Sequence, residues 1–384
     1  MNRKAHPSQL RLGLVVAALL VATSPSSAQE LRLPLKEGSV RFAIMGDTGT
    51  GSTAQFDVGK QMAAFHKKFP FEFVIMAGDN IYGGSSDAAA LKSRFEVPYA
   101  ALLDAKVKFW ASLGNHDNAS QANYKNWNMG GQRFYTFRAD DNGPAKIGAR
   151  FFALDSNYMD QKQLTWIESE LKKSKSEWKI AFFHHPLYSS GGKHGSATDL
   201  RSLVEPLFMA NGVTVVFAGH DHFYERIKPQ NGIYHFVVGA GGSLRKGDID
   251  RSSGLTEVGY DADYSFMLAE ISGLDLYFQA VSRTGKTIDS GVIHHTPFAE
   301  VAAPAAPLPA SGSTPVVAAP VAAQPPVGPS PSPSPQPSPT ASPATPAPTV
   351  TGSPSPKATP AASPKPKATP KPKPTPTPSP KPSP

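Results

Sequence analysis

Residue types that bind metal ions follow directly after five short apolar runs in this sequence. The five segments are Gly46-Asp47-Thr48-Gly49, Gly78-Asp79-Asn80-Ile81-Tyr82, Gly114-Asn115-His116-Asp117, His184-His185-Pro186 and Gly219-His220-Asp221-His222. Carboxylate, phenolate, amide and imidazole groups suit hard and borderline metal ions. Sites in α/β proteins assemble at the carboxyl ends of strands. These residues therefore predict a site for two metal ions that activates water and binds an anionic substrate.

Each of these fragments has a simpler explanation when it stands alone. A Gly-Asp pair before a turn is more often a turn former than a ligand. An isolated pair of histidines lies more often on the surface or in the core than on a metal ion. The metal site is favoured because the same kind of residue recurs at five expected strand ends.

The apolar runs that precede these segments have the length of buried strands and alternate with helical patterns. Amphipathic spacing predicts helices over Gln163–Leu171 and Asp199–Phe208. Late in the chain, Tyr234–Val238, Phe266–Ile271, Leu274–Val281 and Thr287–Ile293 read as one β-meander. The pattern predicts an α/β body. The earlier expected strands are Val40–Gly46, Phe73–Ala77, Val107–Leu113, Phe151–Leu154, Ile180–Phe183 and Val213–Ala218.

The N-terminal 28 residues are typical of a secretory signal peptide. Arg3, Lys4 and Arg11 form a basic region before the short apolar run Leu12–Ala22, and Ser26-Ser27-Ala28 forms a small-residue cleavage site. The alternative is an uncleaved membrane anchor, but no apolar run reaches the ~18 residues of a membrane span. We expect cleavage after Ala28 and a secreted, periplasmic or cell-surface protein.

The last 84 residues, 301–384, hold 29 of the 39 prolines, six Lys and no acidic residue. Such a segment has no hydrophobic face to bury, so we expect a disordered tail that acts as an extended spacer. Its Lys-Pro repeats are compatible with contact to an anionic cell wall or surface, and equally with a solvated linker. The expected domains are therefore a signal peptide (1–28), a folded body (29–300) and this tail.

Composition excludes several functional classes. The net charge of +8 belongs to the two ends, because residues 29–300 carry 29 basic and 30 acidic side chains. The high pI therefore does not indicate a nucleic-acid groove, and no nucleic-acid partner is expected. The chain has no Cys, which excludes disulfide scaffolds and thiol chemistry.

The ordered set GDTG, GDNIY, GNHD, HHP and GHDH resembles the calcineurin-like metallophosphoesterase superfamily. The tyrosine three residues after the second Asp resembles the purple acid phosphatases, especially the tartrate-resistant type. The resemblance covers about residues 38–295 and includes Val238-Gly239-Ala240-Gly241-Gly242. It implies a four-layer α/β/β/α sandwich with two mixed β-sheets and the motif loops at one edge.

The resemblance also implies a role for each motif residue. One ferric ion would be held by Asp47, Tyr82 and His222, and Asp79 would bridge to a divalent ion, Fe²⁺, Zn²⁺ or Mn²⁺. Asn115, His184 and His220 complete the implied second site. His184 is preferred to His185 by the family pattern, and alternation along a strand agrees that only one of the two faces the site.

Two further histidines are expected on the substrate side of the centre. His116 follows Asn115, and His194 lies in the Gly-rich stretch 191–195. The family pattern implies that they stabilise the substrate phosphate or protonate the leaving group, for which an imidazole pKa is suitable. A supporting hydrogen-bonding role is the alternative for His116. Asp117 and Asp221 are expected to support ligands, His66 to be solvated, and His235, His294 and His295 to have no role in the site.

These features together predict a secreted acid phosphatase that hydrolyses small phosphate monoesters. Attack of a metal-bound hydroxide is the implied mechanism. One alternative is a phosphodiesterase or nucleotidase of the same superfamily, because loops over the site decide between these substrates. An alternative of another class is a surface-associated binding protein whose tail provides the main function.

Overall fold

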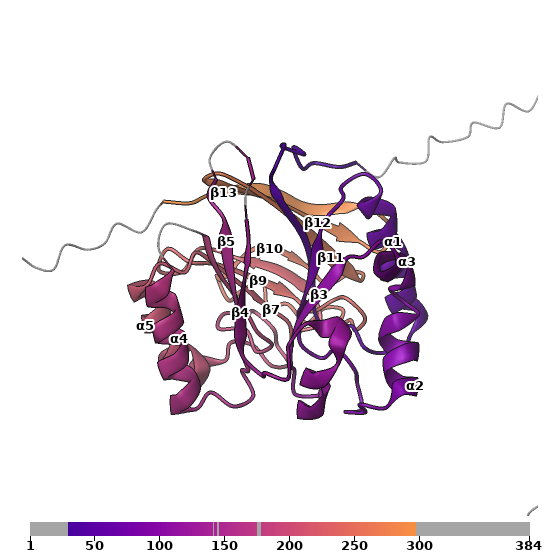
Figure 1. Ribbon diagram of the computed structural model, residues 1–384, viewed down its shortest axis with the longest axis horizontal. Coiled ribbons are helices and arrows are strands. Elements are labelled where there is room, and N and C mark those ends of the chain that lie inside the picture. Colours follow the sequence, from indigo (N-terminus) through magenta and orange to yellow (C-terminus); the bar gives the residue numbers. More distant parts are fainter. Residues whose placement is uncertain (1–29, 141, 144–145, 175–177, 297–384) are drawn as a thin grey trace, which may run out of the picture. The chain divides into compact units, whose positions relative to one another are not determined.

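Two mixed β-sheets packed face to face form the centre of the fold in the computed structural model, which describes residues 30–296 apart from 141, 144–145 and 175–177 (Figure 1). The expected signal peptide and the expected tail lie outside these residues. The first sheet has six strands in the order β13-β12-β11-β1-β2-β3, and the second has seven in the order β10-β8-β9-β7-β6-β5-β4. The strands of the first sheet are β1 (Val40–Met45), β2 (Phe73–Ala77), β3 (Lys108–Ser112), β11 (Ser265–Ser272), β12 (Asp275–Ser282) and β13 (Thr287–His294). Those of the second are β4 (Tyr135–Ala139), β5 (Ala149–Ala153), β6 (Trp178–Phe182), β7 (Val215–Ala218), β8 (Tyr224–Ile227), β9 (Tyr234–Val238) and β10 (Thr256–Tyr260).

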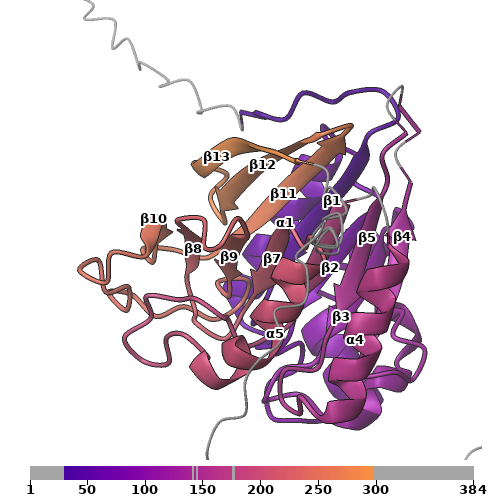
Figure 2. The same cartoon turned by 90° about the vertical axis from the view of Figure 1, so that its left-hand side faces the viewer.

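Helices cover the outer face of each sheet, which completes four layers (Figures 1 and 2). Over the six-stranded sheet lie α1 (Thr53–His66), α2 (Ala88–Leu91) and α3 (Ala100–Asp104), with a π-helical segment, η1 (Lys92–Glu96), between the last two. Over the seven-stranded sheet lie α4 (Gln161–Lys173) and α5 (Thr198–Ala210). Two short 3₁₀ helices, η2 (Ala119–Asn123) and η3 (Lys125–Trp127), follow β3. The predicted four-layer α/β/β/α sandwich is confirmed.

Three apolar cores occupy the three interfaces between these layers. One lies between α1–α3 and the first sheet, a second between the two sheets, and a third between the second sheet and α4 and α5. Strand β1 shows why the strands at the centre of the fold appear in the sequence as nearly unbroken apolar runs. Ala43 and Met45 point into the first core, while Phe42 and Ile44 point into the second. Because successive side chains alternate between faces, a strand covered on both faces is apolar throughout.

Polar contacts fix the two sheets relative to each other at both edges. The Trp178 indole donates to the Gly273 carbonyl at 2.9 Å, and the Tyr135 hydroxyl donates to the Ala111 carbonyl at 2.7 Å. Tyr224 in β8 donates to the Asp289 carboxylate in β13 at 2.8 Å. Each partner of these contacts comes from the opposite sheet or its loops, so the apolar second core has a defined orientation.

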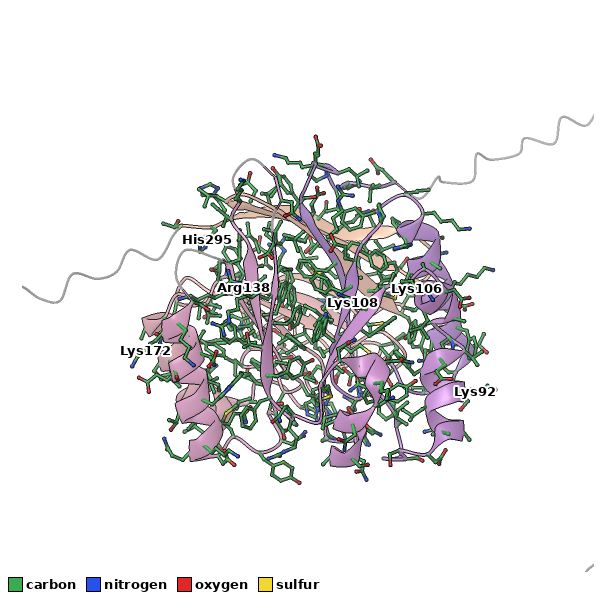
Figure 3. The ribbon with its side chains drawn as sticks, in the orientation of Figure 1. Lys92, Lys106, Lys108, Arg138, Lys172 and His295 are labelled. Carbon is green, nitrogen blue, oxygen red and sulfur yellow. The ribbon has the colours of Figure 1, made fainter. Side chains whose placement is uncertain are left out.

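Two lysines of the outer helical layers extend away from the fold. Lys92 and Lys172 point away from the sheets, at opposite sides of the molecule (Figure 3). Lys172 forms an exposed i,i+4 pair with Glu168 at 2.6 Å. Among the described residues, no helix is both long and apolar enough to cross a membrane.

The predicted helices and most predicted strands lie where the sequence indicated, within a few residues. The single late meander was wrong: β9 belongs to the seven-stranded sheet beside β7, and only β11, β12 and β13 form the meander. Strands β4, β8 and β10 were not predicted. They are short, and β4 and β10 lie at sheet edges where half-exposed polar residues interrupt the apolar pattern.

Candidate metal centre

Five loops meet at one edge of the two sheets. Strands β1, β2 and β3 run parallel in the first sheet, as do β5, β6, β7 and β9 in the second, so their following loops share an edge. Backbone bonds join these loops: the Asp47 amide donates to the Gly78 carbonyl at 2.9 Å, and the Gly219 amide donates to the His184 carbonyl at 2.9 Å. The Gly46 amide donates across to the Val238 carbonyl at 2.9 Å, which links the two sheets.

A first cluster of ligand-type side chains contains Asp47, Asp79 and His222. One potential ligand atom from each lies within 4.8 Å of the others. The Tyr82 hydroxyl lies 3.1 Å from His222 Nε2 and 3.3 Å from Asp47 Oδ1. Two carboxylates, a phenol and an imidazole therefore converge, and this donor set suits a hard, highly charged cation.

A second cluster contains His184, His185 and His220, again within 4.8 Å. Asn115 Oδ1 is 2.9 Å from His184 Nε2, and His220 Nδ1 is 3.1 Å from the same atom. His184 Nδ1 lies 3.1 Å from the Ala77 carbonyl. That bond fixes Nδ1 as the protonated nitrogen and leaves the lone pair of Nε2 facing the cluster.

Asp79 connects the two clusters. Its Oδ1 lies 3.4 Å from His184 Nε2 in the second cluster, while its carboxylate also belongs to the first. The His116 amide donates to the same Oδ1 at 2.9 Å and holds the carboxylate in place. The structure thus puts Asp79 between the two groups, the place expected of a bridging ligand.

The backbone at this edge is unusual, and glycines leave room for the ligand side chains. Asp47, Asp79 and His220 all adopt positive φ, at 55°, 52° and 71°, a conformation that non-glycine residues seldom adopt. A Cβ on Gly114 would lie 2.1 Å from Asp79 Oδ1, and one on Gly219 would lie 2.4 Å from Asp47 Oδ2. No side chain fits at either glycine while the adjacent carboxylate keeps its position.

The electrostatics of the site favour a bound cation. Burial, and then the charge of Asp79, raise the pKa of Asp47 well above its usual range. Burial and the neighbouring imidazoles lower the pKa of His220 to about 2, and burial followed by the Arg245 charge lowers that of His222 to about 4. The imidazoles are therefore neutral and cannot balance the two carboxylates, whereas a metal ion would compensate the carboxylates and use the imidazole lone pairs. The donor set fits two metal ions.

The two histidines expected on the substrate side also reach this edge. The His116 ring lies 4.9 Å from the Tyr82 ring, beside the first cluster. The His194 ring lies 4.1 Å from the His220 ring, beside the second. Both side chains are exposed to solvent, in contrast to the buried Asp47, Asp79 and His184. An anion that approaches from solvent would meet both imidazoles.

His185 does not follow the expectation from strand alternation. Both His184 and His185 contribute to the second cluster, and the His185 ring lies 4.4 Å from that of His220. Strand β6 ends at Phe182, so the pair lies in a loop where alternation no longer applies. Ser156 Oγ accepts from the His185 amide at 3.0 Å and lies 2.9 Å from its Nδ1, which fixes the ring.

Asp117 and Asp221 support the loops that carry the candidate ligands. Asp117 accepts four bonds of 2.8–3.1 Å from N–H groups of Asn80, Ile81 and Gly114, which join the loops after β2 and β3. Desolvation raises its pKa to about 7. Asp221 accepts from the Ser189 hydroxyl at 2.6 Å and from the Gly195 amide at 3.1 Å, and so holds the loop that bears His194.

The remaining histidines lie away from the centre, though not all as expected. His66 was expected to be solvated, but it is half-buried: its Nε2 is 3.1 Å from the Phe71 carbonyl and its ring is 4.8 Å from the Phe71 ring. His235 is buried, and neither ring nitrogen has a hydrogen-bond partner among the described residues. His294, on the edge strand β13, lies 3.0 Å from Asp275 of β12, and His295 packs on Trp178.

Sequence reasoning missed Arg245 in the loop after β9. Its amide donates to the His222 carbonyl at 2.9 Å, and its charge contributes to the lowered pKa of both His222 and His194. The Gly-rich stretch 239–242 at the start of this loop was visible in the sequence. A Cβ at Gly241 would lie 2.7 Å from the Gly46 carbonyl oxygen, and one at Gly242 would lie 2.1 Å from the Thr48 carbonyl oxygen. Close backbone approach explains the glycines; nothing in their pattern indicated the arginine.

Comparison with known proteins finds a family match for part of this domain and similar proteins along most of it. Residues 40–224 match the family described as Calcineurin-like phosphoesterase. Purple acid phosphatase 4 of Arabidopsis thaliana is 27% identical over 267 residues, which are 60% of this chain and 77% of that protein. Tartrate-resistant acid phosphatase type 5 of Oryctolagus cuniculus is 24% identical over 305 residues, 67% of this chain and 93% of that one.

Two solved structures share the fold. GAP50, the anchor in the inner membrane complex of Plasmodium, aligns with a TM-score of 0.59 at 24% identity over 67% of this chain and 89% of that chain. A purple acid phosphatase from yellow lupin (Lupinus luteus) seeds aligns with a TM-score of 0.55 at 19% identity, over 67% of this chain and 54% of that chain. Residues 40–224 thus match a calcineurin-like phosphoesterase domain, and the two structures show that the described body has the same fold.

Proposed function

We propose that this chain is an exported acid phosphatase that hydrolyses phosphate monoesters at a centre of two metal ions. The observation that carries the proposal is the convergence of two ligand clusters on Asp79 at one edge of the sandwich. The similarity to purple acid phosphatases and to tartrate-resistant acid phosphatase supports it. The carboxylates of the first cluster follow strands of the six-stranded sheet, and the imidazoles of the second follow strands of the seven-stranded sheet. Both sheets are therefore needed to form the site.

The two clusters suit different ions. Asp47, Tyr82 and His222 would hold Fe³⁺, for which a tyrosinate is a hard anionic ligand, and Asp79 would bridge. Asn115, His184 and His220 would hold a divalent Fe, Zn or Mn ion. Burial and the two carboxylates raise the pKa of Tyr82, so ionisation of its phenol requires the positive charge of an ion.

The protein groups around the centre bind and orient the ester. When bound, two such ions would bind phosphoryl oxygens and lower the pKa of water, which is the chemistry that phosphate hydrolysis needs. His116 and His194 lie on the solvent-exposed side of the two clusters. From there they would donate hydrogen bonds to the phosphate, and one of them would protonate the departing alcohol oxygen.

A visible absorption spectrum with elemental analysis of the same sample tests this proposal. We expect about two metal ions per chain, one of them iron, and a broad tyrosinate-to-iron band that Tyr82→Phe removes while iron remains bound. A chain that binds only zinc or manganese and shows no band would contradict the ferric centre. Relative turnover of p-nitrophenyl phosphate and bis-p-nitrophenyl phosphate then separates the monoesterase from the phosphodiesterase alternative.

Export and surface retention form a separate part of the proposal. The basic, apolar and small-residue order of residues 1–28 supports a cleaved signal, and the six lysines of 301–384 without an acid support contact with an anionic surface. N-terminal sequencing of the mature protein should begin at Gln29. Deletion of 301–384 should reduce salt-sensitive retention on cells and leave turnover in solution unchanged; equal retention of both forms would reject the surface role.

A further inference from the structure

A cavity of about 530 Å³ lies beside the second cluster. Its inner wall includes Asn115 and His185, which also belong to or contact that cluster. The cavity therefore adjoins the proposed metal centre. The outer wall is formed by Arg133 and by the loop after β5, residues 155–158, of which only Ser156 contacts the second cluster, through His185.

The outer wall is rigid and its charges are balanced. Arg133 Nη1 lies 2.5 Å from Asp155 Oδ2, and Asp155 Oδ1 accepts from the Asn157 amide at 3.0 Å. Asp155 is buried, and its backbone amide donates to Gln163 Oε1 at 2.8 Å. With Arg133 paired in this way, the wall offers no uncompensated cation for a second phosphate group.

Tyr158 presents an aromatic surface on this wall. It is 67% exposed, the largest value among the large apolar side chains of the described residues. The Arg133 guanidinium lies 5.4 Å from the ring centroid and supports it by a cation–π contact. A large exposed ring beside a cavity is typical of a ligand surface, because aromatic rings stack on tyrosine in offset or edge-to-face geometry.

We propose that this cavity receives the alcohol part of the substrate and that Tyr158 selects esters whose alcohol carries an uncharged aromatic ring. The inference rests on the proposed function. On hydrolysis, the oxygen of water bonds to phosphorus, the bond from phosphorus to the ester oxygen breaks, and the alcohol leaves with a proton. The phosphate would occupy the two clusters, and the departing alcohol would lie in the cavity, beyond Asn115 and His185.

The test compares kcat/KM for phenyl phosphate and methyl phosphate in the metal-loaded protein. We expect Tyr158→Ala to lower the phenyl-to-methyl ratio about three- to tenfold, the range of one lost aromatic contact. Tyr158→Phe keeps the ring and should keep the ratio. Phe56→Ala is the matched control, because it removes an exposed ring from α1, which covers the six-stranded sheet. This variant should not change the phenyl-to-methyl ratio.

A second variant tests the cavity itself. Ala119 is exposed at the cavity wall, so Ala119→Trp should fold and should lower the same ratio by obstructing the space. An unchanged ratio in both Tyr158→Ala and Ala119→Trp would overturn the inference while wild-type hydrolysis of both substrates left the proposed function intact. Failure of the wild type to hydrolyse either substrate would instead reject the proposed function.

Discussion

Asp79 is the residue on which both clusters depend. It lies between Asp47 and His184, and its charge contributes to the raised pKa of Asp47. The two buried carboxylates therefore repel each other wherever no cation balances them. The same side chain that would bridge two ions makes ionisation of Asp47 unfavourable where no cation is bound.

Asp79→Asn separates these two effects. We expect the variant to bind neither ion and to lose activity by about a thousandfold or more, because one carboxylate cannot bridge two clusters. In chelator the same variant should melt above the chelated wild type, since the repulsion with Asp47 is gone. Elemental analysis measures the metal content, and thermal unfolding in chelator measures the stability. Asp104→Asn, on the surface, is the control for both measurements. Retention of two ions per chain would contradict the bridging role.

His235 offers a stability test that is independent of the metal site. It is buried against the Tyr188 ring at 4.9 Å, and burial lowers its pKa to about 3. An unfolded histidine titrates near 6.5, so the unfolded state binds more protons between about pH 6.5 and 3. Protonation of His235 therefore does not affect the free energy of unfolding above about pH 6.5. Between about pH 6.5 and 3 that free energy falls with the pH, by up to about 1.4 kcal/mol per pH unit.

His235→Phe should remove both the unsatisfied nitrogens and this pH dependence. We expect a gain of about 1–3 kcal/mol at neutral pH, the cost of an unsatisfied buried polar group. Denaturant unfolding at several pH values gives the difference between variant and wild type. That difference should grow as the pH falls from 6.5; a constant difference would show that His235 is not the titrating group.

At the scale of elements, the loops after the parallel strands depend on glycine as much as on ligands. Gly114 has no positive φ, so its requirement is only the space beside Asp79. This is a constraint that a side-chain motif does not express.

Gly114→Ala tests that constraint. The new Cβ would lie 2.1 Å from Asp79 Oδ1, so the carboxylate must move and metal affinity should fall about 10- to 100-fold. Gly148→Ala is the control, because its Cβ comes no nearer than 3.1 Å to a neighbour at a strand edge away from the site. Metal titration with chelator competition measures the change. Equal affinities in the two variants would show that the loop relaxes freely.

Element-level prediction from the sequence succeeded where burial on both faces made the signal strong. The range Phe73–Ala77 matches β2, and Tyr234–Val238 matches β9. The partner of β9 could not be predicted, because strand pairing depends on residues far apart in the chain. Strand alternation could not separate His184 from His185, because it requires knowledge of where β6 ends. Arg133 and Tyr158 carried no motif, so only the fold brings them beside Asn115.

At the scale of the whole molecule, the candidate ligands link the two sheets. Asp47, Asp79 and Asn115 follow strands of the six-stranded sheet, whereas His184, His220 and His222 follow strands of the seven-stranded one. Bound ions would therefore connect the two halves of the sandwich. Their binding energy contributes to folding, because the unfolded chain does not bring these groups together.

Metal removal should accordingly lower the melting temperature of the whole domain. An ion present at one hundred times its Kd adds about 2.7 kcal/mol, and a domain of this size shifts by roughly 2–4 °C per kcal/mol. We expect chelation to lower Tm by about 5–10 °C for each of the two ions removed, in a single cooperative transition. Scanning calorimetry with and without chelator measures it; an unchanged Tm would indicate that neither cluster binds an ion in the native protein.

The direction of the last strand has a practical consequence. Strand β13 runs opposite to β12, which runs opposite to β11, which runs opposite to β1, so the described chain leaves the sandwich at the edge farthest from the five loops. The His295 amide donates to the Leu274 carbonyl and its ring rests on Trp178, at the start of β6. A support coupled behind residue 296 would hold the domain with its catalytic face toward the bulk solution. Immobilisation directly after residue 296 should thus preserve diffusion of substrate to the candidate metal centre.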